Sequence, residues 1–280
     1  MILVTGATGT VGGQVAGLLA GTRPLRILAR RRSEVAAAGP DAEVVRGEYA
    51  DHGSLLRALT GVRAAFLVTN DIAEPDDERF VAAARASGVR HVVKLSAYAV
   101  ADPQAQDLIT RKQRQNERIL RDSGLDWTFL RPRAFMSNAL AWAPRVRSDG
   151  VVRALHGSAP DACVDPRDIA EVAVRALTGP GHEGKAYQLT GPEAITPQQQ
   201  TACLSEALGR PLRFQELTAD QARSQLLRRY PPVVAEALMR SAQRRLEGGK
   251  SQVVSTVRDV TGSPARDFRA WATDHAEAFA

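Results

Sequence analysis

The sequence predicts an α/β fold, and three observations lead to this class. Short apolar runs alternate with segments of helical period in the first half, which is typical of a parallel sheet covered by helices. A glycine-rich turn follows the first apolar run directly, and after Pro132 the rhythm changes to short strands among helical segments. We expect a doubly wound parallel sheet over 1–132 and a smaller, mostly helical region over 133–280.

The apolar runs of the first half are continuous, as expected for strands buried on both faces. The predicted strands cover 2–5, 25–29, 43–46, 65–69, 91–96 and 127–131. Helical period predicts helices between them, over 11–19, 54–59, 77–87 and 109–123.

In the second half, proline stands at or near the start of four helical segments, a position that helices favour. The predicted helices cover 166–177, 197–208, 219–227, 232–246 and 264–279. Short strands are predicted at 151–153, 186–189 and 212–214. The run at 186–189 is interpreted as a further strand of the large sheet.

Composition excludes several classes of function. The net charge of +6 is compatible with a nucleic-acid partner, but the arginines are scattered along helical segments without a nucleic-acid-binding motif. Cys163 and Cys203 lie far apart without metal-ligand spacing, so neither a disulfide framework nor a metal site is expected. The chain opens on a predicted strand and has no apolar run that could span a bilayer. We expect a cytoplasmic protein without nucleic-acid or membrane partners.

The glycine-rich turn has the spacing of a phosphate-binding loop. Its residues are Gly6, Ala7, Thr8, Gly9, Thr10, Val11 and Gly12. The first glycine permits the tight turn, the second lets the backbone approach a pyrophosphate, and the third allows close helix packing. The N-terminus of the following helix favours anions. Between a strand and a helix, this spacing predicts a dinucleotide site in a Rossmann-like fold.

The second predicted strand ends in Arg30, Arg31 and Arg32. Sites that prefer NAD place an acidic residue about here, to bind the ribose 2′-hydroxyl. Guanidinium groups at this position can instead bind a 2′-phosphate. The sequence therefore predicts NADP(H), with Arg30 and Arg31 as the contacts and Arg32 able to face solvent.

Several further segments stand out besides the glycine-rich turn. With the turn they are VTGATGTVG at 4–12, VRGEY at 45–49, FLVTN at 66–70, VKLS at 93–96, GLDWTFLRP at 124–132 and DPRDIA at 165–170. In these segments the chain resembles the NmrA-like group of atypical short-chain dehydrogenases/reductases, which includes isoflavone-reductase-like and quinone-reductase-like enzymes. The angucyclinone ketoreductases, such as the simocyclinone-pathway enzyme, also belong to this group. The resemblance spans nearly the whole chain.

The resemblance implies further cofactor contacts at the carboxyl ends of strands. It places Glu48 and Tyr49 around the adenine, although many members have Asp where this chain has Glu48. It places Val68, Thr69 and Asn70 beside the nicotinamide ribose. Pro132 and Ala134 would lie beside the nicotinamide itself.

The catalytic dyad of the wider superfamily is absent. That dyad is a tyrosine with a lysine four residues later, in which the tyrosine protonates a carbonyl oxygen. None of Tyr49, Tyr98, Tyr187 and Tyr230 has a lysine four residues later. Alignment of the helix places Ile109 and Gln113 where the dyad would be, and neither side chain is an acid.

Three alternatives remain for the proton donor. Ser96 ends the fifth predicted strand, where the superfamily keeps a catalytic serine, and its hydroxyl can hydrogen-bond a carbonyl. Tyr98 can donate a proton with help from Lys94 or Lys112, or it can merely pack at the mouth of the cleft. Alternatively, the substrate has an acidic group of its own, and the protein contributes orientation and hydride.

Residues after the sixth strand are candidates for an apolar substrate pocket. An alternative for the first four is that they form the seam between the two regions, and a lone histidine such as His156 is more often a surface residue than a catalytic one. The candidates are Phe135, Met136, Asn138, Trp142 and His156.

The leading hypothesis is an NADPH-dependent reductase that acts on a ketone or quinone carbonyl of a bulky aromatic molecule, as in polyketide tailoring for antibiotic biosynthesis. An NmrA-type redox sensor that binds NADP without turnover is the alternative from another class. A carbon–carbon double-bond reductase or an epimerase would share the same fold and cofactor. The oligomeric state stays open.

Overall fold

The computed structural model describes residues 1–31, 35, 39 and 42–280, which form two compact units. Unit 1 comprises Met1–Pro103, Thr110–Pro132 and Pro166–Gln188, and unit 2 comprises Gln104–Ile109, Arg133–Asp165 and Leu189–Ala280. Residues 166–185, which the sequence analysis placed in the second region, therefore fall in unit 1. They do so because the helix at 166–178 packs on the first helix and on three strands of the large sheet.

Unit 1 is built on a sheet of seven strands in the order β3-β2-β1-β4-β5-β6-β8. The strands are β1 (Ile2–Thr5), β2 (Leu25–Ala29), β3 (Glu43–Arg46), β4 (Ala64–Leu67), β5 (His91–Leu95), β6 (Asp126–Pro132) and β8 (Lys185–Leu189). The first six pair in parallel. The strand order reverses between β1 and β4, which is the point where doubly wound sheets bind ligands. The predicted fold class is confirmed.

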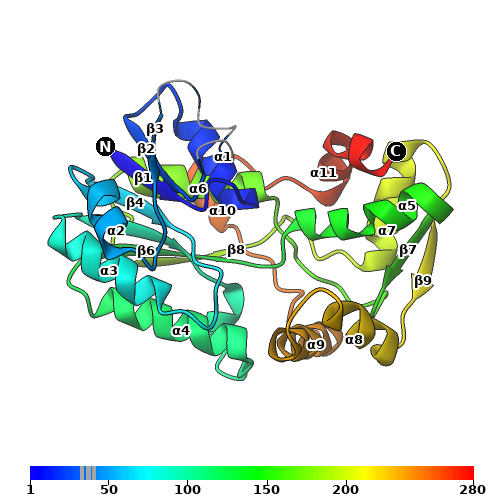
Figure 1. Ribbon diagram of the computed structural model, residues 1–280. Helices are drawn as coiled ribbons and strands as arrows, with labels where there is room; N and C mark the ends of the chain where they lie inside the picture. The colour runs from blue at the N-terminus through cyan, green and yellow to red at the C-terminus, as the bar shows by residue number, and fades with distance from the viewer. Residues whose placement is uncertain (32–34, 36–38, 40–41) are drawn as a thin grey trace. The chain divides into compact units, whose positions relative to one another are not determined.

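Helices cover both faces of this sheet (Figure 1). They are α1 (Thr10–Leu19), α2 (His52–Leu59), α3 (Asp76–Ala86), α4 (Leu108–Arg121) and α6 (Pro166–Thr178), with a short 3-10 helix η3 (Tyr98–Ala101) after β5. Helices α2, α3 and α4 lie on one face, where fully buried Leu55, Phe80, Leu120 and Phe129 form a core. Helices α1 and α6 pack together on the other face.

Unit 2 is mostly helical, as predicted. A two-stranded parallel sheet of β7 (Val151–Ala154) and β9 (Arg213–Glu216) contacts α5 and α7. The helices are η4 (Met136–Trp142), α5 (Ala143–Asp149), α7 (Pro197–Leu208), α8 (Ala219–Leu227), α9 (Pro232–Leu246), α10 (Thr256–Thr261), α11 (Phe268–Asp274) and η5 (Ala276–Phe279). Its core surrounds Trp271, which is 1% exposed.

The single helix predicted over 264–279 is wrong in its bounds, because the structure has α11 and the short helix η5 there. The Asp267 side chain accepts a hydrogen bond from the Ala270 N–H at 2.7 Å, so α11 begins only after this cap. Helices η4, α5 and α10 were not predicted because each is too short to show a sustained period.

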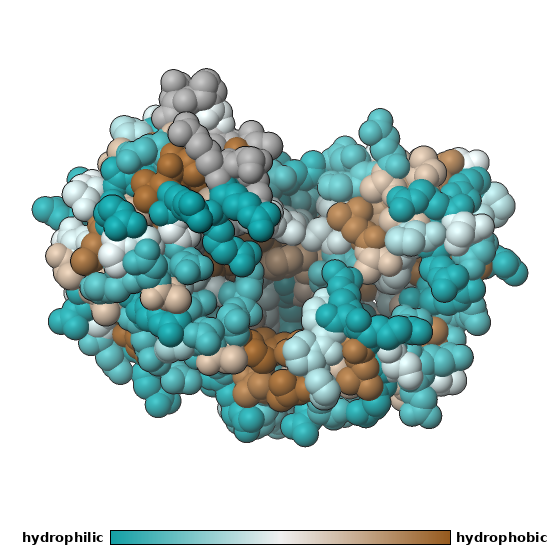
Figure 2. All heavy atoms as spheres, in the orientation of Figure 1, coloured by the Kyte–Doolittle hydropathy of each residue, from teal (hydrophilic) through white to brown (hydrophobic). Residues whose placement is uncertain are grey.

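The face in Figure 2 is mainly hydrophilic, with scattered hydrophobic patches. Among the described residues, the most exposed large apolar side chains are Leu227, Val233 and Leu246 on α8 and α9. No helix in the described ranges has the length and apolar character to cross a membrane.

A buried ion pair joins β5 to α3. The Lys94 Nζ lies 2.5 Å from Asp77 Oδ1, and the Lys94 side chain is 0% exposed. The Thr69 hydroxyl donates to Asp77 Oδ2 at 2.6 Å and accepts from Lys94 Nζ at 3.1 Å. This arrangement fixes the residues that follow β4 against the neighbouring strand and helix.

We expect Lys94→Met to lower the free energy of unfolding by about 3 kcal/mol or more, because it leaves the Asp77 carboxylate buried without its partner. Urea unfolding measures this change. The double variant Lys94→Met/Asp77→Asn should regain part of the loss, and Lys112→Met, at a half-buried position on α4, is the control. Unfolding of Lys94→Met at the wild-type urea concentration would contradict the assignment.

Candidate functional site

The glycine turn joins β1 to α1 in the way the spacing predicts. Gly6 has a φ of +65°, and its carbonyl accepts a hydrogen bond from the Gly9 N–H at 2.9 Å. A Cβ on Gly12 would overlap the carbonyl oxygen of Gly6. A Cβ on Gly6 would lie 2.9 Å from the Cβ of Val68. Because both positions are glycine, α1 and the residue after β4, Val68, can each pack directly against the turn.

The N-terminus of α1 is suited to a pyrophosphate. Gly9 is the N-cap residue, and no side chain caps the helix. Thr8, Gly9 and Thr10 are exposed beside it, while Val11 is buried and anchors the helix. Uncapped N–H groups and the helix dipole attract an anion, so the loop fits the diphosphate of a dinucleotide.

Arg30 and Arg31 follow β2 directly, at the carboxyl edge of the sheet, and both are exposed. Arg32 lies outside the described residues. Exposed guanidinium groups at this edge fit a ribose 2′-phosphate, so the 2′-phosphate role of Arg30 and Arg31 stays a prediction with a compatible location.

Tyr49 lies beside the end of β4. Its hydroxyl donates to the Val68 carbonyl at 2.6 Å, and burial raises the pKa of this phenol, which keeps it protonated as a donor. The Thr5 hydroxyl accepts from the Val68 N–H at 2.9 Å. The structure thus brings together Gly6, Tyr49 and Val68, three residues predicted from separate motifs.

The remaining predicted contacts at this edge differ in exposure. Glu48 is exposed, and its backbone N–H donates to the Ser54 hydroxyl at 3.2 Å near the start of α2. Thr69 is buried and held by Asp77, whereas Asn70 is exposed after it. Asn70 therefore has the freer side chain for a ligand.

Ser96 belongs to a polar network that the sequence analysis missed. Its hydroxyl donates to Glu117 Oε1 at 2.7 Å. Glu117 is completely buried and pairs through Oε2 with Arg131 at 2.6 Å and with Arg121 at 2.9 Å. With its proton donated to a carboxylate, the Ser96 oxygen is left as an acceptor. A catalytic role for Ser96 stays a prediction.

Tyr98 begins the helix η3 and is 6% exposed. Lys94, which the sequence analysis offered as its helper, is held by Asp77 and Thr69. Lys112 is half-buried on α4. The role of Tyr98 as a proton donor stays a prediction.

Helix α4 has the amide of Gln113 at the place of the dyad's lysine and the amide of Asn116 three residues later. The Gln113 Oε1 and Asn116 Oδ1 atoms are buried without a hydrogen-bond partner among the described residues. Buried carbonyl oxygens normally accept a hydrogen bond, so both suit a hydroxyl or amide donor of a ligand or water. Neither amide can act as a proton donor of the tyrosine type.

The segment after β6 enters unit 2. The Ala134 carbonyl accepts from the Val164 N–H at 2.9 Å, and Phe135 forms a bridge with Val164. Met136 is 2% exposed within the core of unit 2. The other residues of the predicted set are buried Pro132 at the end of β6, exposed Asn138, and partly buried Trp142 at the margin of that core.

His156 has a φ of +57°, which lies in the left-handed region that residues other than glycine rarely adopt. Such a conformation is strained and persists only where neighbours hold it. The next residue supplies this restraint, because the Gly157 N–H donates to Glu216 Oε2 at 2.9 Å.

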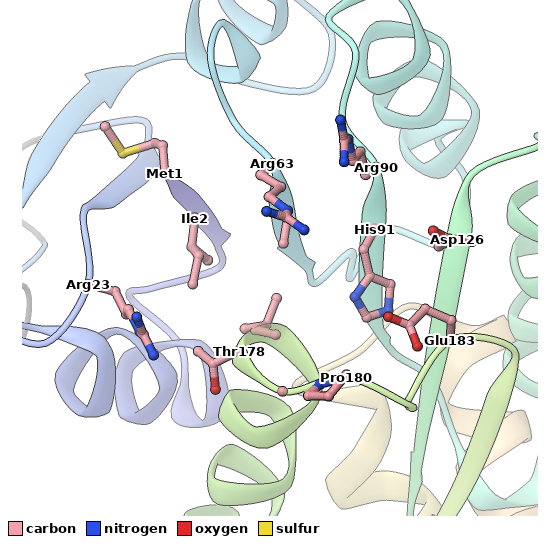
Figure 3. A pocket seen from close by; sticks show the side chains of 13 residues that line it. Met1, Ile2, Arg23, Arg63, Arg90, His91, Asp126, Thr178, Pro180 and Glu183 are labelled. Carbon is pink, nitrogen blue, oxygen red and sulfur yellow. The ribbon is translucent and has the colours of Figure 1, made fainter.

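A cavity of about 520 Å³ lies at the opposite edge of the unit 1 sheet (Figure 3). It is lined by residues at the amino ends of strands, among them Ile2, Ala64 and His91, and by the end of α6. Open α/β sheets bind their ligands at the carboxyl ends, so this cavity is not the dinucleotide site. The described residues also contain no cluster of ligands that could hold a metal ion.

Comparison with known proteins identifies the family. The model of a family described as NAD(P)H-binding matches residues 6–180, which includes the glycine turn and the ends of the parallel strands. The chain belongs to this family. The resemblance to the NmrA-like group is confirmed as well.

Three known proteins show how far the similarity extends. A (4-alkanoyl-5-oxo-2,5-dihydrofuran-3-yl)methyl phosphate reductase of Streptomyces griseus is 63% identical over 280 residues, covering 100% of this chain and 99% of that protein. Quinone oxidoreductase 2 of Escherichia coli is 30% identical over 94% of each chain. Its structure with NADPH has a TM-score of 0.84 over 98% of this chain and 99% of that chain. The negative transcriptional regulator NmrA, solved with NADP, has a TM-score of 0.75 at 17% identity over 98% and 94%, which shows the fold alone.

These findings confirm the cofactor and the class of activity. The protein is an NADPH-dependent oxidoreductase of the atypical short-chain dehydrogenase/reductase group. The glycine turn and the uncapped start of α1 are the parts of the chain that fit the diphosphate of NADP(H).

We expect Arg30→Gln/Arg31→Gln to weaken NADPH binding about tenfold or more, because charged hydrogen bonds to the 2′-phosphate are lost. NADH binding should not change. Fluorescence titration measures both, with Arg85→Gln on α3 as an exposed control. Equal affinity of the wild type for NADH and NADPH would contradict the assignment.

Gly12→Ala should displace α1 from the turn, since its Cβ overlaps a backbone oxygen. We expect destabilisation by about 1–3 kcal/mol and at least tenfold weaker NADPH binding. Gly53→Ala is the matched control, because its Cβ would lie 3.3 Å from Asp51 Oδ1 and 3.5 Å from Arg57 Nη1, without overlapping a backbone atom. Urea unfolding and cofactor titration together test this, and a Gly12→Ala protein with normal values for both would refute it.

Proposed function

We propose that this protein reduces the conjugated carbon–carbon double bond of a (4-alkanoyl-5-oxo-2,5-dihydrofuran-3-yl)methyl phosphate with NADPH. The observation that carries the proposal is the 63% identity to the Streptomyces griseus reductase of such a compound, over essentially the full length of both chains. The other sequence feature that supports it is the missing tyrosine–lysine dyad.

The chemistry of this compound explains why the dyad is dispensable. The double bond joins ring carbons 3 and 4, and carbon 4 has both the alkanoyl carbonyl and the ring carbonyl attached. When bound, NADPH supplies a hydride, which would add to carbon 3. The displaced electron pair then spreads from carbon 4 over two carbonyl oxygens, and a proton from water at carbon 4 completes the saturated lactone.

Reduction of an isolated ketone makes a different demand. The electron pair ends on one oxygen as an alkoxide, a strong base that needs an acid placed beside it. Gln113 stands where the aligned lysine would be, and Ser96 donates its proton to Glu117. This arrangement suits a substrate that stabilises its own anion better than one that needs a protein acid.

The chain's residues would then work by binding and orientation. The glycine turn would hold the diphosphate, and Arg30 and Arg31 the 2′-phosphate. Gln113 and Asn116 would accept hydrogen bonds from ligand hydroxyl groups, because their oxygens are buried and otherwise unpartnered in the described part of the chain. Holding the reacting carbon against the hydride donor is the way such a site accelerates the reaction without an acid of its own.

Quinone reduction is the second candidate, because quinone oxidoreductase 2 of Escherichia coli is 30% identical. A quinone also accepts hydride without a strong protein acid, since the product anion is a phenolate. No comparable observation supports an aromatic polyketide ketone as the substrate.

The test is NADPH oxidation with a 4-alkanoyl butenolide methyl phosphate, followed by identification of the product. We expect the saturated lactone with its alkanoyl carbonyl intact. Deuteride from labelled NADPH should appear at ring carbon 3, and deuterium from D₂O at ring carbon 4. Formation of the side-chain alcohol would identify a ketoreductase and refute the proposal.

Variants of the two hydroxyl candidates serve as the mechanistic control in the same assay. Tyr98→Phe and Ser96→Ala should keep kcat within about threefold of the wild type if water protonates the product anion. A loss of about a hundredfold or more, in the range of general acid catalysis, would assign the proton to the protein instead.

A further inference from the structure

Basic side chains gather around one buried carboxylate inside unit 2. Asp161 is 5% exposed, and its backbone pairs with Ile195 in both directions at 3.1 Å. The Ala162 N–H donates to the Lys250 carbonyl at 3.0 Å, which ties the segment after α9 to this place. Arg133 and Arg245 also lie close enough to act electrostatically on Asp161.

The side chain of Lys250 is mostly buried, but its ion pair with Asp161 is long. Its side chain is 18% exposed, and Nζ lies 3.9 Å from Asp161 Oδ2, too far for a hydrogen bond. Nζ donates to the Ser241 hydroxyl at 2.8 Å. The pKa of Lys250 is lowered to about 8, mainly by burial; the charge of Asp161 opposes this shift, and the neighbouring arginines Arg245, Arg244 and Arg133 add to it.

The guanidinium of Arg245 has an N–H group that makes no hydrogen bond to the described residues. One of its terminal nitrogens, Nη2, donates to the Leu155 carbonyl at 2.6 Å. Its Nε is buried without a hydrogen-bond partner among the described residues, and the carboxylates of Asp161 and Glu216 act on the guanidinium only through their charge, without a hydrogen bond to Nε. Arg244, the next residue of α9, is by contrast paired with Asp107 at 2.8 Å. A partly buried guanidinium normally uses its N–H groups in hydrogen bonds, so the unused Nε–H of Arg245 can donate to a ligand oxygen.

We propose that Arg245 and Lys250 form a subsite for the phosphate monoester of the substrate. This inference rests on the proposed function, because the compound named for the Streptomyces griseus relative has a methyl phosphate group. A phosphate monoester has close to two negative charges and three strong acceptor oxygens near neutral pH. The Arg245 guanidinium and the Lys250 ammonium provide the donors for such a group.

The surroundings of the subsite position these two cations. Leu155, whose carbonyl Arg245 binds, directly precedes the strained residue His156. Arg245 thereby helps to hold the turn that contains a predicted substrate contact. Asp161 attracts both cations when no phosphate is bound, and its negative charge opposes a bound phosphate.

Direct binding of methyl phosphate tests the subsite without any turnover. The protein is first saturated with NADP⁺, so that the glycine turn and the 2′-phosphate site are occupied. We expect calorimetry to show saturable binding, weakened about tenfold or more in Arg245→Met and in Lys250→Met. Arg240→Met is the matched control, because Arg240 lies on the same helix with its side chain 62% exposed.

A second variant predicts the opposite sign. Asp161→Asn removes the competing negative charge without changing the shape of the side chain, so methyl phosphate should bind more tightly. Lys250→Arg keeps the cation and should retain binding, which covers the case in which Lys250→Met fails to fold. Wild-type protein that shows no saturable binding, or equal binding by all variants, would overturn the subsite.

Kinetics with the butenolide separates this inference from the proposed function. Removal of the phosphate from the substrate should raise KM by about tenfold or more in the wild type and much less in Arg245→Met, with kcat little changed. Reduction of both compounds with equal KM would refute the subsite and leave the function standing. If methyl phosphate binds in a way that depends on Arg245 but neither compound is reduced, the proposed function is refuted and an anion site is left. If inorganic phosphate binds as tightly as methyl phosphate, that site is assigned to the free ion.

Discussion

The contact between Gly12 and the carbonyl of Gly6 determines where the first helix of unit 1 begins. A side chain at Gly12 would overlap that oxygen, so only glycine lets α1 start directly against the turn after β1. The uncapped N-terminus of α1 is then held at the carboxyl edge of the sheet. Val68 meets the same turn from β4, and Tyr49 and Thr5 hold Val68 there. The cofactor site is therefore a consequence of close backbone packing at the reversal of strand order.

Much of unit 1 could be predicted because its signals are local and continuous. Four-residue runs such as Ile2–Thr5 and Glu43–Arg46 were predicted with their observed bounds, and the glycine spacing alone identified the loop. Unit 2 was harder to predict. Its short helices lack a sustained period, and the cap at Asp267 cuts the last predicted helix short. The return of 166–185 to unit 1 depends on packing between α6 and α1, a contact between residues far apart in sequence, whereas the strand at 186–189 was predicted as part of the sheet.

The polar networks escaped prediction for a related reason. Ser96 was singled out from its place after β5, but its partner Glu117 lies on α4 among many charged residues with no local sign of burial. Strand β5 pairs with β6 so that Leu95 lies opposite Leu130, and this register brings Ser96 beside Arg131. Both side chains then bind the Glu117 carboxylate. The same holds for Lys94, which looked available for catalysis in the sequence and is neutralised by Asp77 from α3. Charge partners across a sheet are set by topology, which a single sequence shows only indirectly.

These networks also bear on the chemistry. Two polar groups near the end of β5 are committed to holding the scaffold: Ser96 to Glu117, and Lys94 to Asp77 and Thr69. A site organised in this way binds and orients well but offers little acid strength, since its ionisable groups are already neutralised by one another. On the proposed function, such a site suits substrates whose own carbonyl groups can hold the electron pair that arrives with the hydride. A doubly activated double bond meets that requirement, and an isolated ketone does not, so the absence of the tyrosine–lysine dyad favours a particular class of substrate rather than a loss of activity.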